Sequence, residues 1–498
     1  MKNGTLLAAI DLGSNSFRLE ICQFNNGLLH RSEYIKEAVR QGSGLDEDRN
    51  LSPSAMQKGW ECLSRFAERL ADFEPYQVRA VATQTLREAR NRHVFLDKAN
   101  RILGFPIEVV SGREEARLIY QGVSQLLPPS PQRRLVIDIG GRSTEFIIGL
   151  NKTALTLESY RVGSVASSMK YFPSGELTST AFEKAQVAAK AVLDEALQEF
   201  NPNQWDIAYG SSGTVSAVAE ALGQAGWPSD VITRESLEWL KNQLIRYGHV
   251  DKLRLEGMKE ERKAVIGGGL SVLIALVELF EIDALHVTPG ALRHGVLYDL
   301  VERQDDTGDI QTLTVANLRK RFKADAAQAA RVSRLACLFM QQLQLSSQLN
   351  MDWPHLVKKL SWAAQLHEIG ASISHSDAHK HGAYILENTD TPGFAQHELR
   401  RLSLLVLGHK GKLRKLDVDF DDDSFIFQLV SLRLAVIFCH ARRDPEFGSL
   451  NISVSAEHKN CFDLRLEPLF AQRFPQSNHL LQQEALSWQK TRWQMRIV

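Results

Sequence analysis

The sequence contains one strand-turn-strand pattern twice, and this repeat limits the possible folds more than any other feature. Residues 9–21, AIDLGSNSFRLEI, align with residues 136–148, VIDIGGRSTEFII, so that Asp11 and Asp138 occupy the same place. In each copy an apolar strand reaches an Asp, a glycine-containing turn with small hydroxylated residues follows, and a second apolar strand returns as in a hairpin. Two such hairpins predict two related half-domains, and a cleft between their turns would suit metal-complexed phosphate.

Length and local composition divide the chain into three parts. The 498 residues are enough for about three domains. Short apolar runs alternate with helical patterns on both sides of the turn-rich joint Pro128–Pro131, which is typical of α/β units. A second polar break covers residues 304–309. We therefore expect an α/β domain at 1–125, a second α/β domain at 126–305 and a further domain at 306–498.

The C-terminal region is expected to be mainly helical. Apolar residues recur at helical spacing over Thr312–Leu345, Trp353–His367 and Ala395–Leu407. Strand character returns only at Asn451–Val454 and Cys461–Leu466.

Composition excludes several classes of protein. The 59 Lys and Arg residues balance 59 Asp and Glu, so the chain is not built to bind nucleic acid through net charge. The longest apolar stretch, Leu270–Phe280, is far shorter than the roughly 20 residues of a membrane span and predicts a buried helix. The five cysteines are odd in number and form no CxxC pair, which favours a reducing cytoplasm over a disulfide framework.

Three glycine-rich turns are candidates for phosphate binding. Glycine lets the backbone approach a ligand closely, and successive N–H groups with Ser or Thr hydroxyls bind phosphate oxygens. Any one such turn usually only reverses the chain, but two of these three also follow a strand that ends in Asp. The residues expected to contact phosphate are Gly13, Ser14 and Asn15 in the first turn, Gly140, Gly141, Arg142, Ser143 and Thr144 in the second, and Ser211, Ser212, Gly213 and Thr214 in the third.

Six motifs together resemble the exopolyphosphatase and guanosine pentaphosphate phosphatase family of the sugar-kinase and actin superfamily. They lie at residues 9–17, 82–87, 111–119, 138–145, 210–214 and 290–295, and the similarity continues through Leu366–Gly370 and Ala383–Leu386. The resemblance implies two actin-like, ribonuclease H-like α/β half-domains around a cleft, followed by a mainly α-helical HD-like domain. It also implies a Mg²⁺-dependent hydrolase of phosphoanhydride bonds that acts on inorganic polyphosphate or (p)ppGpp and forms a homodimer.

The motif Ser111-Gly-Arg-Glu-Glu115 places two glutamates at the start of a predicted helix. Ser111 would cap the helix, and Glu114, three residues on, would bond back to the cap as in a capping box. Glu115 would then be free near the positive end of the helix dipole, which favours the ionised carboxylate that a general base needs. The family resemblance places its catalytic base at the same residue. The plainer alternative is a solvated helix glutamate.

Further carboxylates and one arginine join the expected site by resemblance. Asp138 and Glu145 match the family's magnesium-binding and water-positioning carboxylates, so they are counted as catalytic together with Glu115. Asp11 has the matching place in the first hairpin, where it either contributes to the magnesium site or caps its own turn. Arg87 resembles a phosphate-binding arginine of the family, and a surface ion pair is the alternative.

Three other features leave alternatives open. Arg142 stands where relatives usually carry a third glycine, so either its backbone is strained at positive φ or its side chain adds charge to the phosphate site. Leu366-His-Glu368 resembles the His-Asp signature of HD-type phosphohydrolases, but Glu368 replaces the Asp, so a second working metal centre is not expected. The basic run His409–Lys415 is either a track for a long anionic substrate or a solvated face.

These patterns favour an exopolyphosphatase that releases terminal phosphate from inorganic polyphosphate with Mg²⁺. The first alternative is a guanosine-5'-triphosphate,3'-diphosphate phosphatase that converts pppGpp to ppGpp with the same residues. A kinase or ATPase of the superfamily, with Gly267–Gly269 near an adenosine, is a second class. A nucleotide sensor without catalysis is a third, although the presence of Glu115, Asp138 and Glu145 argues against it.

Overall fold

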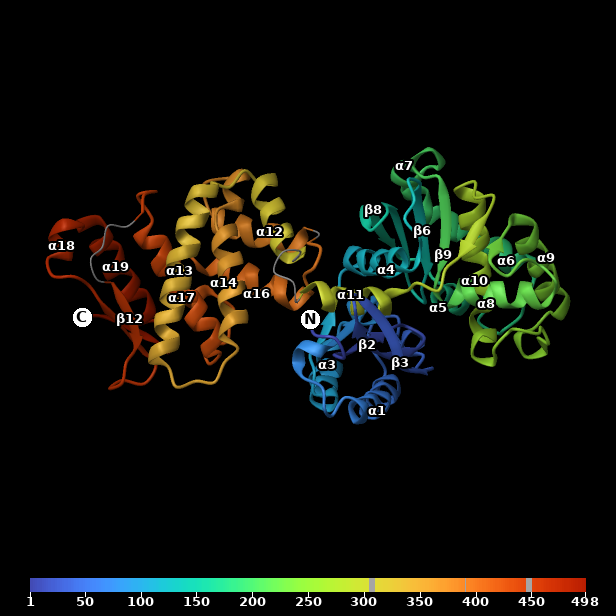
Figure 1. Ribbon diagram of the computed structural model, residues 1–498, viewed down its shortest axis with the longest axis horizontal. Helices are drawn as coiled ribbons and strands as arrows, with labels where there is room; N and C mark the ends of the chain where they lie inside the picture. Colours follow the sequence, from blue (N-terminus) through green and yellow to red (C-terminus); the bar gives the residue numbers. More distant parts are fainter. Residues whose placement is uncertain (304–309, 390, 445–449) are drawn as a thin grey trace. The chain divides into compact units, whose positions relative to one another are not determined.

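The chain forms two compact units, Met1–Asp309 and Ile310–Val498 (Figure 1). The structure is a computed structural model that describes residues 1–303, 310–389, 391–444 and 450–498. The expected domain boundary at 305/306 falls on residues 304–309, which lie outside the described residues. The expected division of the first unit at 125/126 falls next to the end of a helix and stays a prediction.

The first unit contains two mixed sheets with the same topology. The strands of the first sheet are β1 (Leu6–Leu12), β2 (Phe17–Asn25), β3 (Leu28–Glu37), β4 (Val78–Ala82) and β5 (Ile107–Val109), in the order β3-β2-β1-β4-β5. Those of the second are β6 (Arg133–Ile139), β7 (Thr144–Leu150), β8 (Thr153–Tyr160), β9 (Ile207–Ser211), β10 (Val231–Ile232) and β11 (Leu285–Val287), in the order β10-β11-β9-β6-β7-β8.

Each sheet begins with the hairpin that the sequence repeat predicted. β2 and β7 run antiparallel to β1 and β6, whereas β4 and β9 run parallel to them. The hairpin, its third antiparallel strand and the two parallel strands therefore recur in the same order in both halves. This confirms the two actin-like α/β half-domains (Figure 1).

Helices cover both faces of each sheet. The helices of the first unit are α1 (Pro53–Arg69), α2 (Gln84–Glu88), α3 (Arg92–Leu103), α4 (Gly112–Leu126), α5 (Ser164–Tyr171), α6 (Ser179–Leu193), α7 (Leu197–Phe200), α8 (Ser212–Gln224), α9 (Arg234–Tyr247), α10 (Glu260–Leu279) and α11 (Leu292–Arg303). Successive residues of β1 enter different cores, because Ile10 packs with α1 and α3 while Ala9 packs with α4 and α11.

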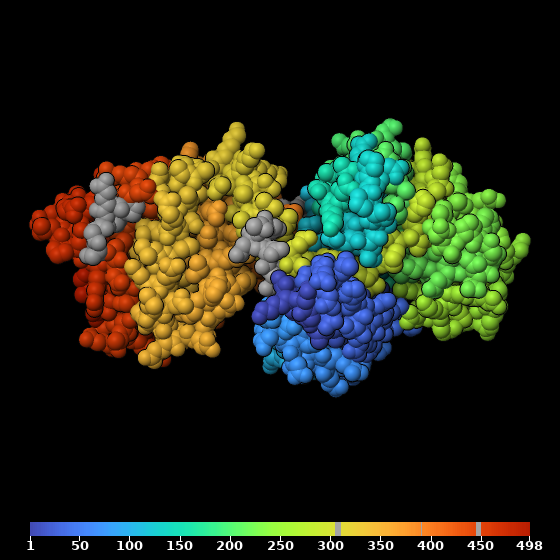
Figure 2. Space-filling model, viewed as in Figure 1, coloured from blue at the N-terminus to red at the C-terminus, as the bar shows by residue number. Residues whose placement is uncertain are grey.

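Helices α4 and α11 form the central layer, between the two sheets. Their side chains share one core with Ala9 of β1 and Val136 of β6. In Figure 2 the blue surface of the first half-domain borders the cyan and yellow-green surface of the second. The two half-domains are thus joined by an apolar core and not only by the chain.

Gly267–Gly269, considered above as part of an adenosine site, has a packing role in the structure. All three glycines are buried within α10. A Cβ at Gly268 would lie 2.3 Å from the backbone nitrogen of Ser168 in α5, so only glycine permits this contact between the helices. This packing explains the glycines without an adenosine, and the adenosine contact of the kinase alternative stays a prediction.

The second unit is mainly helical, as predicted. It contains α12 (Ile310–Arg321), α13 (Ala326–Ser346), α14 (Trp353–Leu366), α15 (Ala378–Asn388), α16 (Gln396–Gly408), α17 (Asp423–Phe438), α18 (Phe470–Arg473) and α19 (Pro475–Trp488). Its small sheet has the order β12-β13-β14, with β12 at Asn451–Val454, β13 at Cys461–Arg465 and β14 at Gln494–Ile497.

Two details of this unit differ from the sequence expectation. The helical window Thr312–Leu345 is divided into α12 and α13, because the Asp325 side chain accepts hydrogen bonds from the N–H groups of Ala327 and Gln328 and starts a new helix. Strand β14 was not expected. Separately, no helix among the described residues has the length and apolar character needed to cross a bilayer.

Candidate active site

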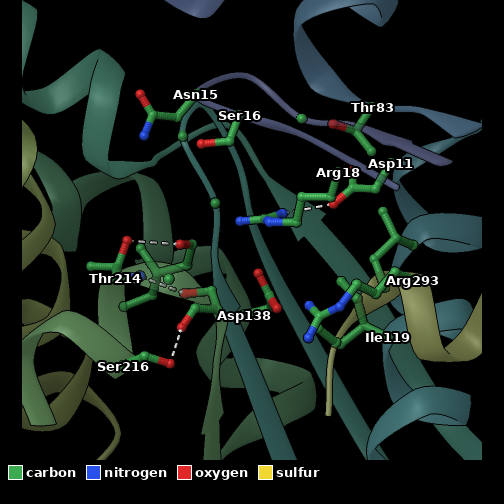
Figure 3. Close-up of a pocket in the computed structure, with 18 of the residues that line it drawn as sticks. Asp11, Asn15, Ser16, Arg18, Thr83, Ile119, Asp138, Thr214, Ser216 and Arg293 are labelled. Carbon is green, nitrogen blue, oxygen red and sulfur yellow. Dashed lines mark hydrogen bonds and ion pairs between the residues drawn. The ribbon is translucent and has the colours of Figure 1, made fainter. Parts of the chain in front are cut away.

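A cavity of about 320 Å³ in the first unit takes its walls from both half-domains (Figure 3). It lies where β1, β6 and β9 end, so the three predicted turns all reach it. Its acidic residues are Asp11, Glu115 and Asp138, and its basic residues are Arg18, Lys36, Arg262 and Arg293. Both signs of charge therefore meet in one polar cavity.

The two repeated turns contact each other at the cavity. A Cβ at Gly141 would lie 2.8 Å from the Cβ of Ser14, so this close approach requires glycine. Ser14 is held in place because its Oγ accepts a 2.7 Å hydrogen bond from Oγ1 of Thr85. The repeat thus brings its two glycine turns together, as the sequence predicted.

Two donors in the first turn are buried without a partner. Asn15 Nδ2 and Ser16 Oγ make no hydrogen bond within the described chain, and both residues line the cavity. A buried donor without a partner is costly, and a phosphate oxygen would satisfy it. These donors fit an anionic ligand.

The third turn begins helix α8 with an unusual backbone. Ser212 has φ 91°, a region that residues other than glycine rarely adopt. The turn presents Ser212, Gly213 and Thr214 to the cavity. The preceding Ser211 lies behind the wall, where its Oγ donates a 2.7 Å hydrogen bond to Oδ2 of Asp138.

Glu115 is a buried carboxylate beside an arginine. Its Oε2 lies 3.0 Å from Nη1 of Arg87, and the residue is 7% exposed. Burial raises the pKa of Glu115 to about 7, with the charges of Asp11 and Asp138 adding to the rise and Arg87 opposing it. A carboxyl group with a pKa near neutrality is suited to accept a proton at physiological pH. The alternative of a solvated helix glutamate is wrong.

The two hairpins differ in charge at equivalent positions. Asp11 pairs across its hairpin with Arg18, whereas Asp138 pairs across the second hairpin with Glu145. Arg18 Nη1 lies 2.7 Å from Oδ2 of Asp11, which neutralises the first carboxylate. The second hairpin instead places two carboxyl groups side by side.

Burial and mutual repulsion shift the pKa values of the second pair upward. Burial raises the pKa of Asp138 to about 6, and the hydrogen bond from Ser211 opposes the rise. The pKa of Glu145 is well above its usual value, first through burial and then through the charges of Glu115 and Asp138. The ionised forms of Glu115, Asp138 and Glu145 are therefore disfavoured, and a bound cation would stabilise them.

The acids do not form a closed metal cage. Across the described residues, no group of three or more His, Cys, Asp or Glu side chains is close enough to hold an ion. Magnesium commonly binds proteins through only one or two carboxylates, with waters and substrate phosphates as the other ligands. Asp138, which lies beside Glu145 and forms no ion pair in the described part of the chain, fits that kind of site better than Asp11, which is paired with Arg18.

Other predicted site residues also lie behind the cavity wall. Arg87 forms its ion pair with Glu115, and both side chains are largely buried, so the alternative of a surface ion pair is wrong. Glu145 accepts a 2.8 Å hydrogen bond from Ser159, and Thr144 donates a 2.6 Å bond to the carbonyl of Val162. Their predicted direct roles stay predictions.

The structure resolves the alternatives for Arg142. The residue has no positive φ, so its backbone is not strained. Its guanidinium bonds to Glu88 at 3.1 Å and to the carbonyl of Gly42 at 3.0 Å. Arg142 therefore connects the second turn to the first half-domain and adds no charge to the cavity wall.

The sequence patterns did not predict the basic side of the cavity. Arg262 is 8% exposed, lines the cavity and forms no ion pair in the described part of the chain. Burial lowers the pKa of Arg262, and the charge of Arg18 adds to this effect. A Cβ at Gly213 would lie 1.9 Å from its guanidinium, so the third glycine turn leaves the room that Arg262 occupies. One signal in the sequence could have indicated basic residues here. In the repeat, the basic Arg18 aligns with the acidic Glu145, so the two hairpins differ in charge at that position.

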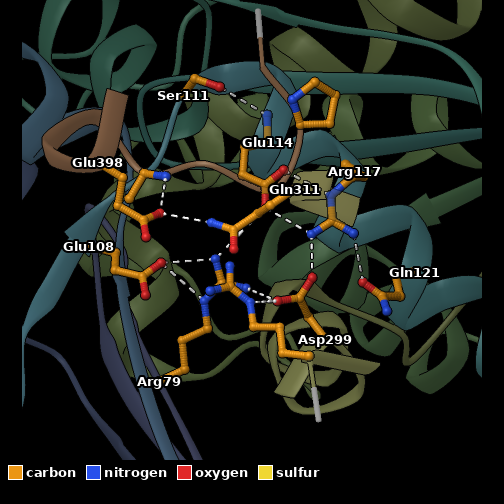
Figure 4. A network of polar contacts seen from close by, with 12 residues as sticks. Arg79, Glu108, Ser111, Glu114, Arg117, Gln121, Asp299, Gln311 and Glu398 are labelled. Carbon is orange, nitrogen blue, oxygen red and sulfur yellow. Dashed lines mark hydrogen bonds and ion pairs between the residues drawn. The ribbon is translucent and has the colours of Figure 1, made fainter. Parts of the chain in front are cut away.

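A buried ion network lies next to Glu115 (Figure 4). Glu114 is fully buried, and its two carboxylate oxygens each lie 2.8 Å from nitrogens of Arg117. Ser111 Oγ accepts a 3.1 Å bond from the Glu114 N–H, which is the Ser half of the expected capping box. The Glu114 carboxylate has a different role, because it binds Arg117.

Asp299 of α11 is the centre of this network. It accepts 2.5 Å hydrogen bonds from Arg79 of β4, Arg117 of α4 and Arg303 of its own helix. Burial alone would raise the pKa of Asp299, but the three arginines hold it far below its usual range. The network therefore fixes the helix that carries Glu115 to α11 and to the first sheet.

The second unit has a separate cavity of about 1030 Å³. It contains His367 and His409, whose ring centroids are 5.4 Å apart and whose Nδ1 atoms bond to the carbonyls of Ala364 and Val406 at 2.6 Å. Burial lowers the pKa of both histidines. Glu368, the residue in place of the HD aspartate, pairs with Arg442.

The fold and the first cavity are those of an actin-like protein, with two related half-domains that share one polar cavity. Comparison with known proteins gives the family. The profile of the Ppx/GppA phosphatase family matches residues 21–304, and that of Ppx/GppA phosphatase, domain III, matches residues 310–488. The chain belongs to the Ppx/GppA phosphatase family and is a hydrolase of phosphoanhydride bonds, as the sequence predicted.

Individual relatives support this assignment. The chain is 40% identical over 495 residues to a guanosine-5'-triphosphate,3'-diphosphate pyrophosphatase of Pseudoalteromonas translucida, covering 98% of this chain and 97% of that protein. A protein of the same name from Vibrio vulnificus is 40% identical over 91% of this chain and 90% of its own. The crystal structure of the Aquifex aeolicus member of the family is 26% identical, with a TM-score of 0.51 over 60% of this chain and 99% of that chain.

The electrostatics of Glu115 predict a pH dependence. A base with a raised pKa is protonated below about pH 7, so kcat/KM should fall as the pH decreases through that value. Arg87 lowers the pKa of Glu115, so Arg87→Leu should move this limb upward by about one pH unit. Arg87→Lys, which keeps the charge, should move it much less. An unchanged profile in Arg87→Leu would contradict the role given to this pair.

The Asp299 network predicts a large loss of stability. Asp299→Asn removes the central charge and leaves the buried Arg79 and the partly buried Arg117 and Arg303 with one carboxylate fewer. We expect the free energy of unfolding in urea to fall by about 3–5 kcal/mol. Asp251→Asn, at a side chain that is 87% exposed, is the control and should change it very little. Equal effects of the two substitutions would show that the network does not stabilise the unit.

Proposed function

We propose that the protein hydrolyses the terminal phosphoanhydride bond of guanosine-5'-triphosphate,3'-diphosphate, giving ppGpp and inorganic phosphate. The names of the two curated relatives carry this choice of substrate, since each matches at least nine-tenths of this chain. They support the pppGpp alternative better than polyphosphate, which the sequence analysis favoured. The basic wall of the cavity supports hydrolysis of a phosphoanhydride in general, because it provides contacts for phosphates beyond the one that is released.

Glu115 is the proposed general base. Its carboxylate would orient a water molecule and accept its proton as the water oxygen attacks the terminal phosphorus. The bond between that phosphorus and the bridging oxygen breaks, and the rest of the nucleotide leaves with the bridging oxygen. Arg87 is the positioning residue for this base, because its guanidinium holds the carboxylate at 3.0 Å.

The glycine turns would hold the terminal phosphate. The unpartnered Asn15 Nδ2 and Ser16 Oγ, together with the third turn, provide donors for its oxygens. Because the first turn is held between β1 and β2 and the third begins helix α8, these donors need no rearrangement as charge moves onto the leaving oxygen. Arg18, beside Asp11, and Arg262 would bind the phosphates next to the one that is released.

Magnesium fits the carboxylates of the second hairpin. Asp138 would hold the ion, with Glu145 behind it and Asp11 on the opposite turn. When bound, Mg²⁺ would supply positive charge to the phosphoryl oxygens. Neutralising the buried acids would also lower their pKa values, which helps keep Glu115 ionised at neutral pH.

Several wider properties also belong to this proposal. We expect a homodimer that acts in the cytoplasm, with an HD-like second unit that has no metal centre of its own. Inorganic polyphosphate stays a possible second substrate, for which the basic run His409–Lys415 would provide binding.

A comparison of substrates tests the proposal. With Mg²⁺, phosphate release by the purified chain should show a higher kcat/KM for pppGpp than for long-chain polyphosphate. Glu115→Gln should lower kcat by about 10²- to 10⁴-fold. Glu235→Gln is the matched control, because Glu235 is in the first turn of α9 and exposed.

Each other outcome has a clear meaning. A preference for polyphosphate would restore the exopolyphosphatase assignment, and undiminished release by Glu115→Gln would show that the base is another group. Tight binding of (p)ppGpp without release would indicate a sensor, and transfer of phosphate from ATP to a sugar would indicate a kinase.

A further inference from the structure

Tyr34 is an aromatic residue at the mouth of an otherwise polar cavity. It lies on β3, lines the cavity and is 39% exposed. No other aromatic side chain occurs among the described residues of this cavity wall. The side chain is too exposed to be part of the core, and its ring offers an apolar face that phosphate contacts do not need.

The register of the first sheet places Tyr34 at a definite distance from the carboxylates. Asp11, Arg18 and Lys36 are direct partners across β1, β2 and β3, and they form one row that leads away from the centre of the cavity. Adjacent strands are about 4.8 Å apart, so β3 lies about 10 Å from Asp11. Tyr34, two residues from Lys36, is on the same face of β3.

This row matches the layout of a nucleoside triphosphate. With the terminal phosphate at the carboxylates, the inner phosphates would pass Arg18 and Lys36, and the nucleoside would reach the level of Tyr34. The basic residues and the ring thus follow the order of the ligand's own parts, from phosphates to base.

The ring of Tyr34 is held by a buried ion pair. The guanidinium groups of Arg293 and Arg31 lie 5.2 Å and 5.8 Å from the ring centroid. Arg293 is paired with Glu20, which is the partner of Tyr34 in the β2–β3 register. Glu20 is 2% exposed, so this support is fixed within the protein. A cation over the ring restrains it before any ligand binds.

We propose that Tyr34 is the platform on which the purine base of the nucleotide substrate stacks. The inference rests on the proposed function and names the part of the substrate that this residue recognises. Loss of a base stack on an aromatic ring by alanine substitution weakens binding by about 5- to 150-fold. An interaction of that size would favour a nucleotide over a base-free polyphosphate at a site where the phosphate contacts are the same.

The test compares two substrates with the same terminal bond, pppGpp and inorganic tripolyphosphate. Tyr34→Ala should lower kcat/KM for pppGpp about tenfold more than for tripolyphosphate, mainly through KM. Tyr34→Phe keeps the ring and should retain the preference for the nucleotide. Tyr76→Ala, at an exposed tyrosine outside the cavity, is the control and should change neither value. An equal loss for both substrates, or no loss, would overturn the inference.

Binding measurements separate this inference from the proposed function. Calorimetry should show that GTP binds more tightly than tripolyphosphate and that Tyr34→Ala removes the difference, whether or not turnover occurs. If the wild-type chain releases no phosphate from pppGpp but shows this binding pattern, the proposed function is wrong and the base site stands. If pppGpp is hydrolysed and Tyr34→Ala leaves the binding difference intact, the base site is wrong and the function stands. Loss of the preference in Tyr34→Phe would show that the hydroxyl group, and not the ring, makes the contact.

Discussion

Helices α4 and α11 cross so closely that a Cβ at position 295 would lie 1.7 Å from the carbonyl oxygen of Leu118. This contact makes a single core with the inner faces of both sheets. Each helix also brings a charged side chain to the cavity, Glu115 from α4 and Arg293 from α11. The positions of the candidate base and of one cavity cation therefore depend on one helix crossing, which the buried Asp299 network ties to the first sheet.

The electrostatics of the site follow from a difference between two otherwise similar hairpins. Arg18 neutralises Asp11 in the first, whereas Glu145 stands beside Asp138 in the second. The second hairpin thus creates a need for a cation and a set of acids with raised pKa values, to which Glu115 belongs. If both hairpins carried an arginine at this position, the acids of the cavity would be neutralised and none would have a pKa near 7. If both carried a glutamate, the carboxylates would repel each other still more.

The sequence predicted the backbone of the site better than its charges. The repeat, with its apolar strands and glycine turns, was sufficient for both sheets and for the meeting of the turns, because these depend on local patterns. It did not predict Arg262 of α10 or Lys36 and Tyr34 of β3, since only tertiary packing and strand register bring them to the cavity. Of the capping box at Ser111, the sequence correctly predicted the bond to the Ser111 hydroxyl. It did not predict that the Glu114 carboxylate binds Arg117, because that choice depends on how α4 is packed. Strand β14 was not predicted, because it is an edge strand of only four residues and so short a segment shows little alternation of apolar and polar residues.

The central claim is that water attacks the terminal phosphorus of the nucleotide with Glu115 as the base. Hydrolysis of pppGpp in ¹⁸O-labelled water, followed by ³¹P NMR of the products, tests it most directly. The account predicts one labelled oxygen in released inorganic phosphate and unlabelled ppGpp. Label in the nucleotide, or release of pyrophosphate instead of phosphate, would contradict it.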